Sequence, residues 1–350
     1  MKRNWRIVTA VTAFALLSPA LASPALADAP EAAGGPIDPR PSTEELRRHL
    51  DWIEKRSRGA VDVTTIGTTN QGRPIFNATV GTGPLRLMYV TQQHGNEPLG
   101  TPAALELLED LGIRPGKDER AVLDRVTLSV VVRANPDGHE LDQRYNHDPD
   151  ADPEYGEPGV GYDPNRYHSP SLAPEDNPVP EAAAVRRQYD AFDPHLVVDY
   201  HMQGRYIDDD GEEITASLMW PTAPGVDDGA RDLSRQAVAV SAEAMEDSYD
   251  GANVSLYPGG DYEGIARNAY GLMGSGSVLV ELSATGPDME QAQIASAYDS
   301  MDGLARSAAD GSLFEVDPDS ADDIPERGDP LPAGQQGQAQ PFQVEGDDLD

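Results

Sequence analysis

The segment Val126 to Arg133 (Val-Thr-Leu-Ser-Val-Val-Val-Arg) constrains the fold more than any other part of the sequence. β-Branched and other apolar side chains fill most of its positions, so neither face of the segment is polar. Such a run is typical of a strand that is buried on both faces. We therefore expect this segment to lie inside a sheet that has other elements packed above and below it.

Strand-like and helix-like segments alternate on both sides of this run. We predict further strands at residues 61–66, 74–80, 85–91, 196–200, 215–220 and 277–281. We predict helices at residues 43–56, 97–111, 180–192, 230–246 and 289–309. This alternation predicts an α/β fold with a mixed, largely parallel central sheet and helices on both faces. In such sheets, sites lie beyond the carboxyl ends of the strands.

Both ends of the chain differ in composition from this middle part. A basic start and a mostly apolar stretch from Ile7 to Leu21 precede the small residues Ala25-Leu26-Ala27, which is the pattern of a secretory signal peptide. No later segment is apolar for long enough to span a membrane, so we expect a soluble protein outside the cytoplasm. The predicted parts are a signal peptide at 1–27, a flexible lead at 28–42, one folded domain at 43–312 and a disordered acidic tail at 313–350.

Composition excludes several classes of function. The chain has 61 acidic and 26 basic residues among 350, a formal net charge of −35. Nucleic acids and anionic membranes bind basic patches, so we expect neither as a partner. We also expect the protein to be a monomer. The absence of cysteine excludes thiolate zinc ligands and cysteine nucleophiles. A surface rich in Asp and poor in Lys suits a salty environment, and a base-composition bias toward Arg is the alternative explanation.

Two candidate metal ligands follow the predicted strand at 85–91. His94 and Glu97 lie three residues apart, a spacing that lets an imidazole and a carboxylate converge on one ion, with Gly95 allowing a sharp turn between them. Zinc in hydrolases takes three protein ligands and keeps one position open. His201, directly after the predicted strand at 196–200, is the candidate third ligand. Taken alone, His94-x-x-Glu97 is more often a surface His beside a helix-capping Glu, and His201 is more often a strand-end His with a satisfied hydrogen bond.

Further polar motifs follow other predicted strands. Asn135-Pro136-Asp137-Gly138 comes after the buried run, Arg144 shortly after it, and Asp163-Pro164-Asn165-Arg166 later. As a turn, the first motif needs no function. Glu281 ends the strand predicted at 277–281, within the run Val278-Leu279-Val280-Glu281-Leu282. Because burying an unpaired carboxylate is costly, a functional role is the better interpretation for Glu281.

In this order, these motifs resemble those of the M14 family of zinc carboxypeptidases, over roughly residues 43–310. The resemblance implies a secreted zinc metallopeptidase that hydrolyses a peptide bond and releases a C-terminal residue. It implies one Zn²⁺ held by His94, Glu97 and His201. It also implies that Glu281 is the general base for the zinc-bound water and that Arg144 stabilises the oxyanion.

The resemblance assigns roles to further residues. Asn165 and Arg166 match the pair that binds the terminal carboxylate of the peptide, and a guanidinium suits this role because it can fork onto both oxygens. Asp163 matches the carboxylate that orients the first zinc-binding His. Tyr257 matches the mobile tyrosine that closes over the substrate, and Tyr262 is a second candidate for this role.

The sequence departs from the family pattern in two places. The acidic stretch 146–161 is longer than the compact family pattern. It could bind Ca²⁺ through oxygen ligands, although a solvated acidic loop is the interpretation that we favour. Tyr167-His168 follows Arg166 where many relatives have Asn and an aromatic residue, which leaves the shape of the carboxylate pocket open.

Other functions use the same residues. Amide hydrolysis on cell-wall peptides and deacylation would rely on the same machinery. A non-catalytic binding module that has kept the fold is the alternative from another class. The acidic surface favours substrates with basic ends through electrostatic steering, but no single residue determines this preference.

Overall fold

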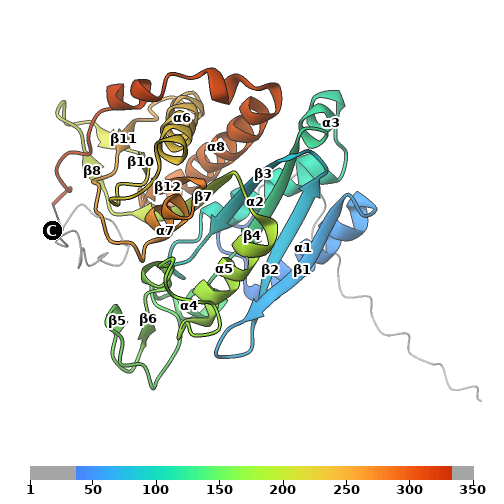
Figure 1. Ribbon diagram of the computed structural model, residues 1–350, viewed down its shortest axis with the longest axis vertical. Helices are drawn as coiled ribbons and strands as arrows, with labels where there is room; N and C mark the ends of the chain where they lie inside the picture. Colours follow the sequence, from blue (N-terminus) through green and yellow to red (C-terminus); the bar gives the residue numbers. More distant parts are fainter. Residues whose placement is uncertain (1–36, 333–350) are drawn as a thin grey trace, which may run out of the picture. The chain divides into compact units, whose positions relative to one another are not determined.

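The computed structural model of the protein describes residues 37–332. The predicted signal peptide, residues 28–36 of the predicted lead and residues 333–350 of the predicted tail lie outside the described residues. The described part contains an eight-stranded sheet with helices on both faces (Figure 1), and this confirms the predicted fold class. No helix of the described part is both long and apolar enough to span a membrane.

The central sheet is mixed, with a parallel middle. Its spatial order is β1 (Val61–Thr68), β2 (Pro74–Gly81), β4 (Val126–Val132), β3 (Leu85–Thr91), β7 (Leu196–Gln203), β12 (Gly276–Ser283), β10 (Ala216–Met219) and β11 (Val254–Leu256). The neighbours β4, β3, β7 and β12 run parallel to one another. β2 pairs antiparallel with both β1 and β4. β10 pairs antiparallel with β12 and parallel with β11. Two short hairpins lie outside this sheet: β5 (Gly156–Glu157) with β6 (Gly161–Tyr162), and β8 (Tyr206–Ile207) with β9 (Glu213–Ile214).

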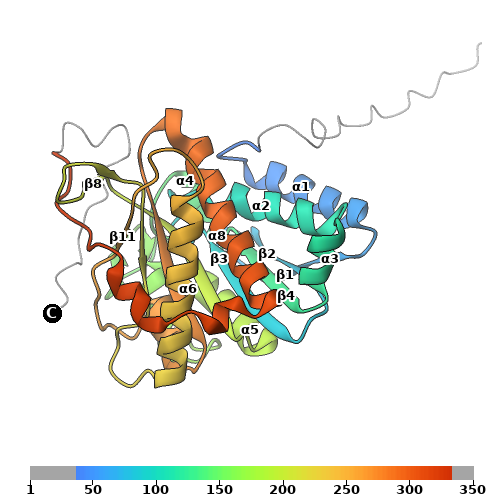
Figure 2. The ribbon, with the colours of Figure 1, turned by 90° about the horizontal axis from the view of Figure 1, so that it is seen from above.

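The helices form two layers around the sheet. They are α1 (Thr43–Ser57), α2 (Gly100–Gly112), α3 (Lys117–Leu123), α4 (Pro136–Leu141), α5 (Pro180–Phe192), α6 (Asp228–Glu246), α7 (Ala266–Leu272) and α8 (Glu290–Asp310). Figure 2 shows α1, α2, α8 and α6 side by side on one face, and α5 and α7 pack against the other. Alternate side chains of β3 serve the two layers, because Leu87 and Tyr89 join one apolar core while Met88 and Val90 join the other.

One predicted boundary is wrong in a way that matters for the site. The helix predicted at 97–111 begins at Gly100 and ends at Gly112, so Glu97 lies in the loop between β3 and α2. Pro98 accounts for the difference, because a residue before proline is disfavoured in the helical conformation. The backbone N–H of Glu97 instead donates to the carbonyl of His94, at 3.2 Å, which keeps the two residues in one tight turn.

The predicted tail begins later than residue 313, so this boundary needs correction. Leu313 is buried, and residues Pro318–Asp323 form a short 3₁₀ helix against α6. The chain then runs along the edge strand β11, where the Leu256 N–H donates to the Pro325 carbonyl (2.7 Å) and the Arg327 N–H to the Leu256 carbonyl (3.0 Å). The average composition of 313–350 hides the few apolar residues that anchor this part. The lead is similarly fixed at its end, where the Pro41 carbonyl accepts a hydrogen bond from Arg133 at 2.6 Å.

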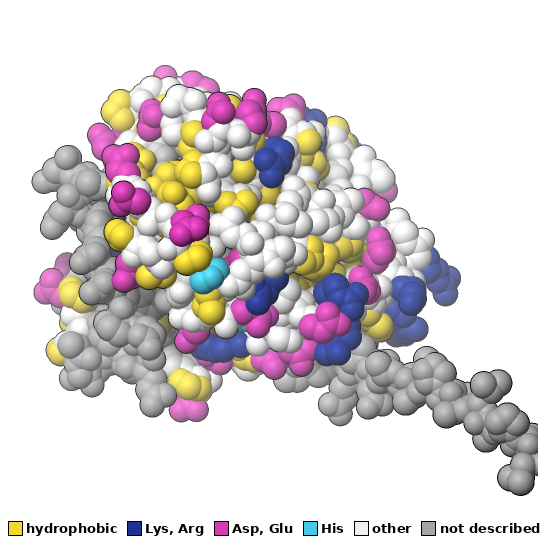
Figure 3. Space-filling view, turned by 90° about the horizontal axis from the view of Figure 1, so that it is seen from below, with side chains coloured by type: hydrophobic (Ala, Val, Ile, Leu, Met, Phe, Trp, Pro, Cys, Tyr) yellow, Lys and Arg dark blue, Asp and Glu magenta, His cyan; other side chains and the backbone are white. Residues whose placement is uncertain are grey.

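Charged side chains are unevenly arranged on the surface. Figure 3 shows one face, on which Asp and Glu side chains lie at many separate places while Lys and Arg side chains gather toward one side. Hydrophobic side chains are interspersed with them on the same face.

Candidate active site

The three predicted metal ligands converge at the carboxyl ends of β3 and β7. These parallel strands are neighbours, and the chain leaves β3 toward β4 on one side while β7 lies on the other. Such a change of direction opens a crevice at the strand ends. His94, Glu97 and His201 meet there, all buried, with one potential ligand atom from each within 4.8 Å of the others.

The contacts of the two imidazoles fit a metal site. His94 Nδ1 lies 2.8 Å and His201 Nδ1 2.9 Å from the carboxylate of Glu97, and the two Nδ1 atoms are 3.0 Å apart. Each Nε2 faces another carboxylate, Asp163 Oδ1 at 3.0 Å for His94 and Asp199 Oδ2 at 2.7 Å for His201. A proton on each Nε2 leaves an Nδ1 lone pair on both rings, and both lone pairs face the same carboxylate. Two lone pairs and a carboxylate at such short distances suit a cation among them, and imidazole and carboxylate are zinc ligands.

Asp199 is itself held by a buried chain of polar groups. Gln93 Nε2 donates to Asp199 Oδ2 at 2.6 Å, and the other end of this amide, Oε1, lies 2.6 Å from His168 Nε2. Burial lowers the pKa of His168 to about 4, so this imidazole is neutral and donates to Gln93. The departure from the family pattern at Tyr167-His168 therefore contributes a residue that positions Gln93 and, through it, Asp199.

Arg144 lies beside the metal ligands. Its Nη1 is 3.2 Å from His94 Nδ1 and 3.5 Å from Glu97 Oε1, while its Nε and Nη2 donate to Asp163 Oδ2 at 3.0 and 2.9 Å. Burial opposes ionisation of Asp163, but Arg144 and then His94 hold the pKa of that carboxyl well below its usual range. Asp163 therefore binds both an imidazole and the guanidinium, and it fixes their relative positions.

The Asn-Pro-Asp-Gly motif supports this arrangement. It forms the start of α4, where Asn135 Oδ1 accepts from the Gly138 N–H at 2.8 Å, while Asn135 Nδ2 donates to the Arg144 carbonyl at 3.4 Å. A Cβ added at Gly95 would lie 2.0 Å from the carbonyl carbon of Gly138. Gly95 is thus required for close packing of the two loops.

Glu281 faces the metal ligands from the neighbouring strand. Residues Glu281 of β12 and His201 of β7 are register partners, so their side chains stand on the same face of the sheet. Glu281 is 8% exposed, and its Oε2 has no hydrogen-bond partner among the described residues. Burial raises the pKa of Glu281 to about 8, against the opposing effect of His201.

The structure brings Asn165 and Arg166 into the same site. Asn165 Nδ2 lies 3.2 Å from His201 Nε2, and its Oδ1 accepts from the Ala266 N–H at 2.8 Å. Arg166 Nη1 donates to the Asn165 carbonyl at 3.0 Å and stands 4.0 Å from Asp163 Oδ2. Asn165 thus connects the metal centre to the start of α7.

The two candidate tyrosines have different surroundings. Tyr262 donates through its hydroxyl to the Arg166 carbonyl at 3.2 Å, and its ring packs on Tyr155 with the ring centres 4.7 Å apart. The guanidinium of Arg327 lies 4.4 Å from the ring centre of Tyr257, and 3.8 Å from that of Tyr206. Tyr262 is therefore held against the backbone of the Asn165–Arg166 segment. Tyr257 stacks separately with Arg327.

The family model for zinc carboxypeptidases (Peptidase M14) matches residues 46–219, which include all three metal ligands. The chain belongs to the M14 family of zinc carboxypeptidases. "Probable carboxypeptidase 2" of Trichophyton verrucosum (strain HKI 0517) is 30% identical over 151 residues, covering 42% of this M14 chain and 26% of the relative. The M14 chain thus spans about a quarter of the length of the curated relatives that it matches.

Solved structures share the fold of this M14 chain. The metallo-carboxypeptidase from Burkholderia cenocepacia superposes with a TM-score of 0.56 at 19% identity, over 75% of this chain and 68% of that one. Carboxypeptidase A from Helicoverpa armigera gives a TM-score of 0.60 at 19% identity, over 77% and 74% of the two chains.

The acidic stretch 146–161 of the M14 chain does not have the features of a ligand site. In the acidic stretch 146–161, Asp148 Oδ1 accepts from the Asp150 N–H at 3.0 Å, and no calcium site is supported. Among residues 37–332, His94, Glu97 and His201 are the only group of His, Cys, Asp or Glu found close enough to hold an ion.

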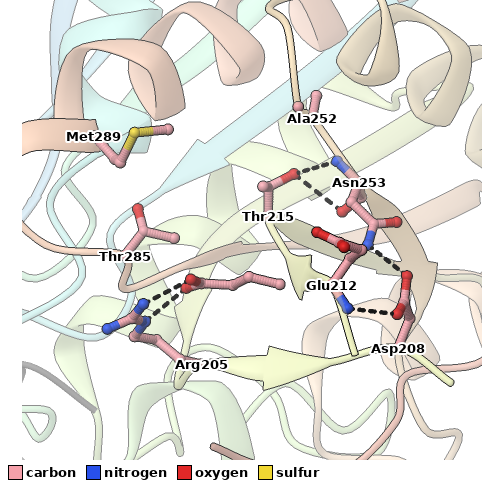
Figure 4. A pocket seen from close by; sticks show the side chains of 10 residues that line it. Arg205, Asp208, Glu212, Thr215, Ala252, Asn253, Thr285 and Met289 are labelled. Carbon is pink, nitrogen blue, oxygen red and sulfur yellow. Dashed lines mark hydrogen bonds and ion pairs between the residues drawn. The ribbon is translucent and has the colours of Figure 1, made fainter. Parts of the chain in front are cut away.

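A cavity of about 510 Å³ lies away from this centre, beside the β8–β9 hairpin (Figure 4). Three of its charged side chains, Arg205, Asp208 and Glu213, are bonded within the lining. Arg205 pairs with Glu213 at 2.6 Å, and Asp208 accepts from Asn253 Nδ2 and the Glu212 N–H, both at 2.9 Å (Figure 4). Because these three side chains already have partners, they give no indication of a polar ligand in the cavity.

Several residues of the site were missed from the sequence. Asp199 lies two positions before His201 and therefore on the same face of β7, a period-two relation that could have identified it. Gln93 and His168 gave no such indication, because their roles depend on contacts across the fold. Arg327 was missed because it lies in the part assigned to a disordered tail.

Proposed function

We propose that the protein is a zinc carboxypeptidase that acts as a monomer on peptides outside the cytoplasm and releases their C-terminal residue. The observation that carries this proposal is the pairing of the imidazoles, whose Nδ1 atoms face Glu97 and whose Nε2 atoms face Asp163 and Asp199. Membership of the M14 family supports the same reaction, and the sequence of residues 1–27 supports export.

His94 and His201, through Nδ1, and Glu97, through its carboxylate, would hold the zinc ion. When bound, zinc supplies Lewis acidity and lowers the pKa of a coordinated water to roughly 7. Asp163 and Asp199 keep the protons on the Nε2 atoms, so that both Nδ1 lone pairs remain available. This arrangement explains why two further carboxylates are buried next to the ligand set.

Glu281 is the proposed general base. Its carboxylate is buried beside the ligand set, and its Oε2 has no hydrogen-bond partner in the described part of the chain, so this oxygen is available to take a proton from water. Burial raises the pKa of Glu281 to about 8, and a nearby dication would lower it again, which keeps the base ionised at neutral pH.

Arg144 and the Asn165–Arg166 pair are proposed to hold the substrate. Arg144 is fixed by two donations to Asp163, which leaves Nη1 directed at the ligand atoms, where a carbonyl oxygen would gain negative charge. Arg166 would bind the terminal carboxylate with Asn165 beside it, and Tyr257 is proposed to cover the bound peptide.

A Glu281→Gln variant tests the proposed function. We expect the zinc-loaded variant to bind zinc as the unaltered protein does and to lose roughly 10²–10⁴-fold in kcat, the usual contribution of a general base. The assay follows the release of the last residue from N-acetylated tripeptides by mass spectrometry. Glu243→Gln on the exposed side of α6 is the matched control and is expected to change nothing.

Two outcomes would contradict the proposal. Full activity of the metal-loaded Glu281→Gln variant would exclude the proposed base. Cleavage restricted to peptides with amidated C-termini would indicate an endopeptidase or amidase using the same centre.

A further inference from the structure

Arg267 is a buried cation without an ionic partner. It is the second residue of α7 and is 4% exposed. Its Nη2 donates to the Gly260 carbonyl at 3.1 Å and lies 3.4 Å from Thr222 Oγ1, while its Nε has no partner. Among residues 37–332, no Asp or Glu forms an ion pair with Arg267. Burying a charge in this way is unfavourable unless another charge compensates it.

Arg144, whose guanidinium lies against the metal ligands, shows the contrast. Its guanidinium is shared between Asp163 and Glu97, and these carboxylates raise its pKa despite burial. Burial lowers the pKa of Arg267 to about 10, because no carboxylate contact offsets the loss of water. Carboxylates therefore compensate the charge of Arg144, whereas no carboxylate in the described part of the chain forms an ion pair with Arg267.

Arg267 belongs to the candidate active site by its position. The residue before it, Ala266, donates its N–H to Asn165 Oδ1, and Asn165 touches His201. Gly260, which accepts from Arg267, lies on the loop that follows Tyr257. Tyr257, Glu281 and Arg166 are near enough to influence the pKa of Arg267, so the guanidinium lies in the neighbourhood of groups proposed to act on the peptide.

We propose that Arg267 determines specificity by binding the side-chain carboxylate of an acidic C-terminal residue, Asp or Glu, while Arg166 binds the terminal carboxylate. This inference rests on the proposed carboxypeptidase function. Two cations, Arg166 and Arg267, would then meet the two carboxylates at the end of such a peptide. A carboxylate would supply the missing ionic partner and an acceptor for the unbonded Nε.

The net charge of −35 disfavours acidic peptides, but it affects their rate of association and not the bound complex. Long-range repulsion lowers the rate at which an acidic peptide reaches the site, and salt screens it. A short buried contact instead acts on the bound state and is screened little. The steering preference for basic ends, expected from composition, is therefore expected to give way to a local preference for acidic ends.

Matched peptides test this inference. We compare kcat/KM of the zinc-loaded protein for acetyl-Ala-Ala-Glu and the isosteric acetyl-Ala-Ala-Gln. We expect at least a tenfold preference for Glu, loss or reversal of that preference in Arg267→Gln, and partial retention in Arg267→Lys. Arg133→Gln is the matched control, because Arg133 is also buried with an unbonded Nη1 but bonds to Gln92 and Pro41. It should leave the Glu-to-Gln ratio unchanged even where it lowers stability.

A binding measurement separates this inference from the proposed function. Calorimetry with both peptides on the zinc-loaded Glu281→Gln variant, with and without Arg267→Gln, reports preference without turnover. Tighter binding of the Glu peptide that needs Arg267, combined with no hydrolysis by the unaltered protein, would refute the carboxypeptidase and retain the acidic-end site. Equal use and equal binding of both peptides, or an Arg267→Gln effect of the same factor on each, would overturn the inference.

Discussion

Each imidazole of the metal centre uses its two nitrogens for different bonds. Nε2 of His94 and of His201 donates to an aspartate, and this leaves Nδ1 of each ring as the ligand atom. Glu97 lies between the Nδ1 atoms, and burial would raise its pKa if His94 and His201 did not lower it below the usual range. The two aspartates thus favour the tautomer that presents Nδ1 of each ring to an ion.

Glu181 is a buried carboxyl group outside this centre, and it predicts a pH dependence of stability. In the first turn of α5, its Oε2 accepts from Asn146 at 2.8 Å and its Oε1 has no partner among the described residues. Burial raises its pKa from 4.5 to about 7. Below about pH 4.5 both the folded and the unfolded state hold the proton. Between pH 4.5 and 7 only the unfolded state loses it, so this group lowers stability as the pH rises.

Glu181→Gln removes this contribution. At pH 8, we expect the variant to unfold at a higher urea concentration than the unaltered protein. Its free energy of unfolding should be higher by on the order of 3 kcal/mol, as expected for a pKa shift of this size. At pH 4.5 the difference should be small. Glu243→Gln on the exposed side of α6 serves as the control. An equal gain at both pH values would show that titration of Glu181 is not the cause.

At the residue scale, the sequence was sufficient where a side chain lies at or near the carboxyl end of a strand. His94, His201 and Glu281 could be chosen because strand ends and β-branched runs are local patterns. Gln93, His168 and Arg267 could not, because a glutamine, a histidine or an arginine in isolation is equally consistent with a surface position. Their contacts depend on the fold: Gln93 meets His168 from 75 residues away, and Arg267 meets Thr222 from 45 residues away.

At the scale of elements, strand order places the site residues. β3, β7 and β12 are adjacent and parallel, so residues after or near their carboxyl ends become neighbours although they lie far apart in the sequence. The alternation of strands and helices predicted this sheet, whereas the short helices α3, α4 and α7 were not predicted. They have seven or fewer residues, too few for helical periodicity to be recognised, and α4 depends on a single Asn cap.

The segment 324–332 is the element whose role was least evident from the sequence, and truncation tests it. It covers the edge of β11 with two backbone hydrogen bonds and brings Arg327 onto Tyr257. We expect a chain that ends at residue 332 to match the full chain in stability and activity. A chain that ends at residue 323 should lose about 1 kcal/mol or more from the missing hydrogen bonds, and several-fold in kcat/KM because the stack on Tyr257 is lost.

Arg327→Ala in the full chain separates these two effects. It keeps the backbone pairing, so it should reduce kcat/KM with little change in the urea midpoint. If the chain that ends at 323 retained full activity, neither the edge pairing nor the stack of Arg327 on Tyr257 would contribute to the site.

At the scale of the whole molecule, charge is the dominant feature. Acidic residues exceed basic ones by 35, and on the face drawn in Figure 3 they lie at many separate places instead of in one patch. Self-repulsion of this kind destabilises a folded chain and is relieved by salt, whose screening length falls from about 10 Å at 0.1 M to about 3 Å at 1 M. Within the folded part, the cations Arg144, Arg166 and Arg267 are concentrated around the metal ligands.

This arrangement predicts that salt acts differently on stability, on acidic substrates and on basic ones. Between 0.1 and 1 M NaCl, we expect the free energy of unfolding to rise and then level off as repulsion is screened. Over the same range, kcat/KM for acetyl-Ala-Ala-Glu should rise several-fold, because repulsion slows its arrival while its buried contact is screened little. The matched peptide acetyl-Ala-Ala-Lys should show no rise, since screening removes its attraction. KCl in place of NaCl must give the same curves if screening is the cause. A fall in kcat/KM for the Glu peptide with added salt would show that surface charge attracts acidic ends, contrary to the net charge of the chain.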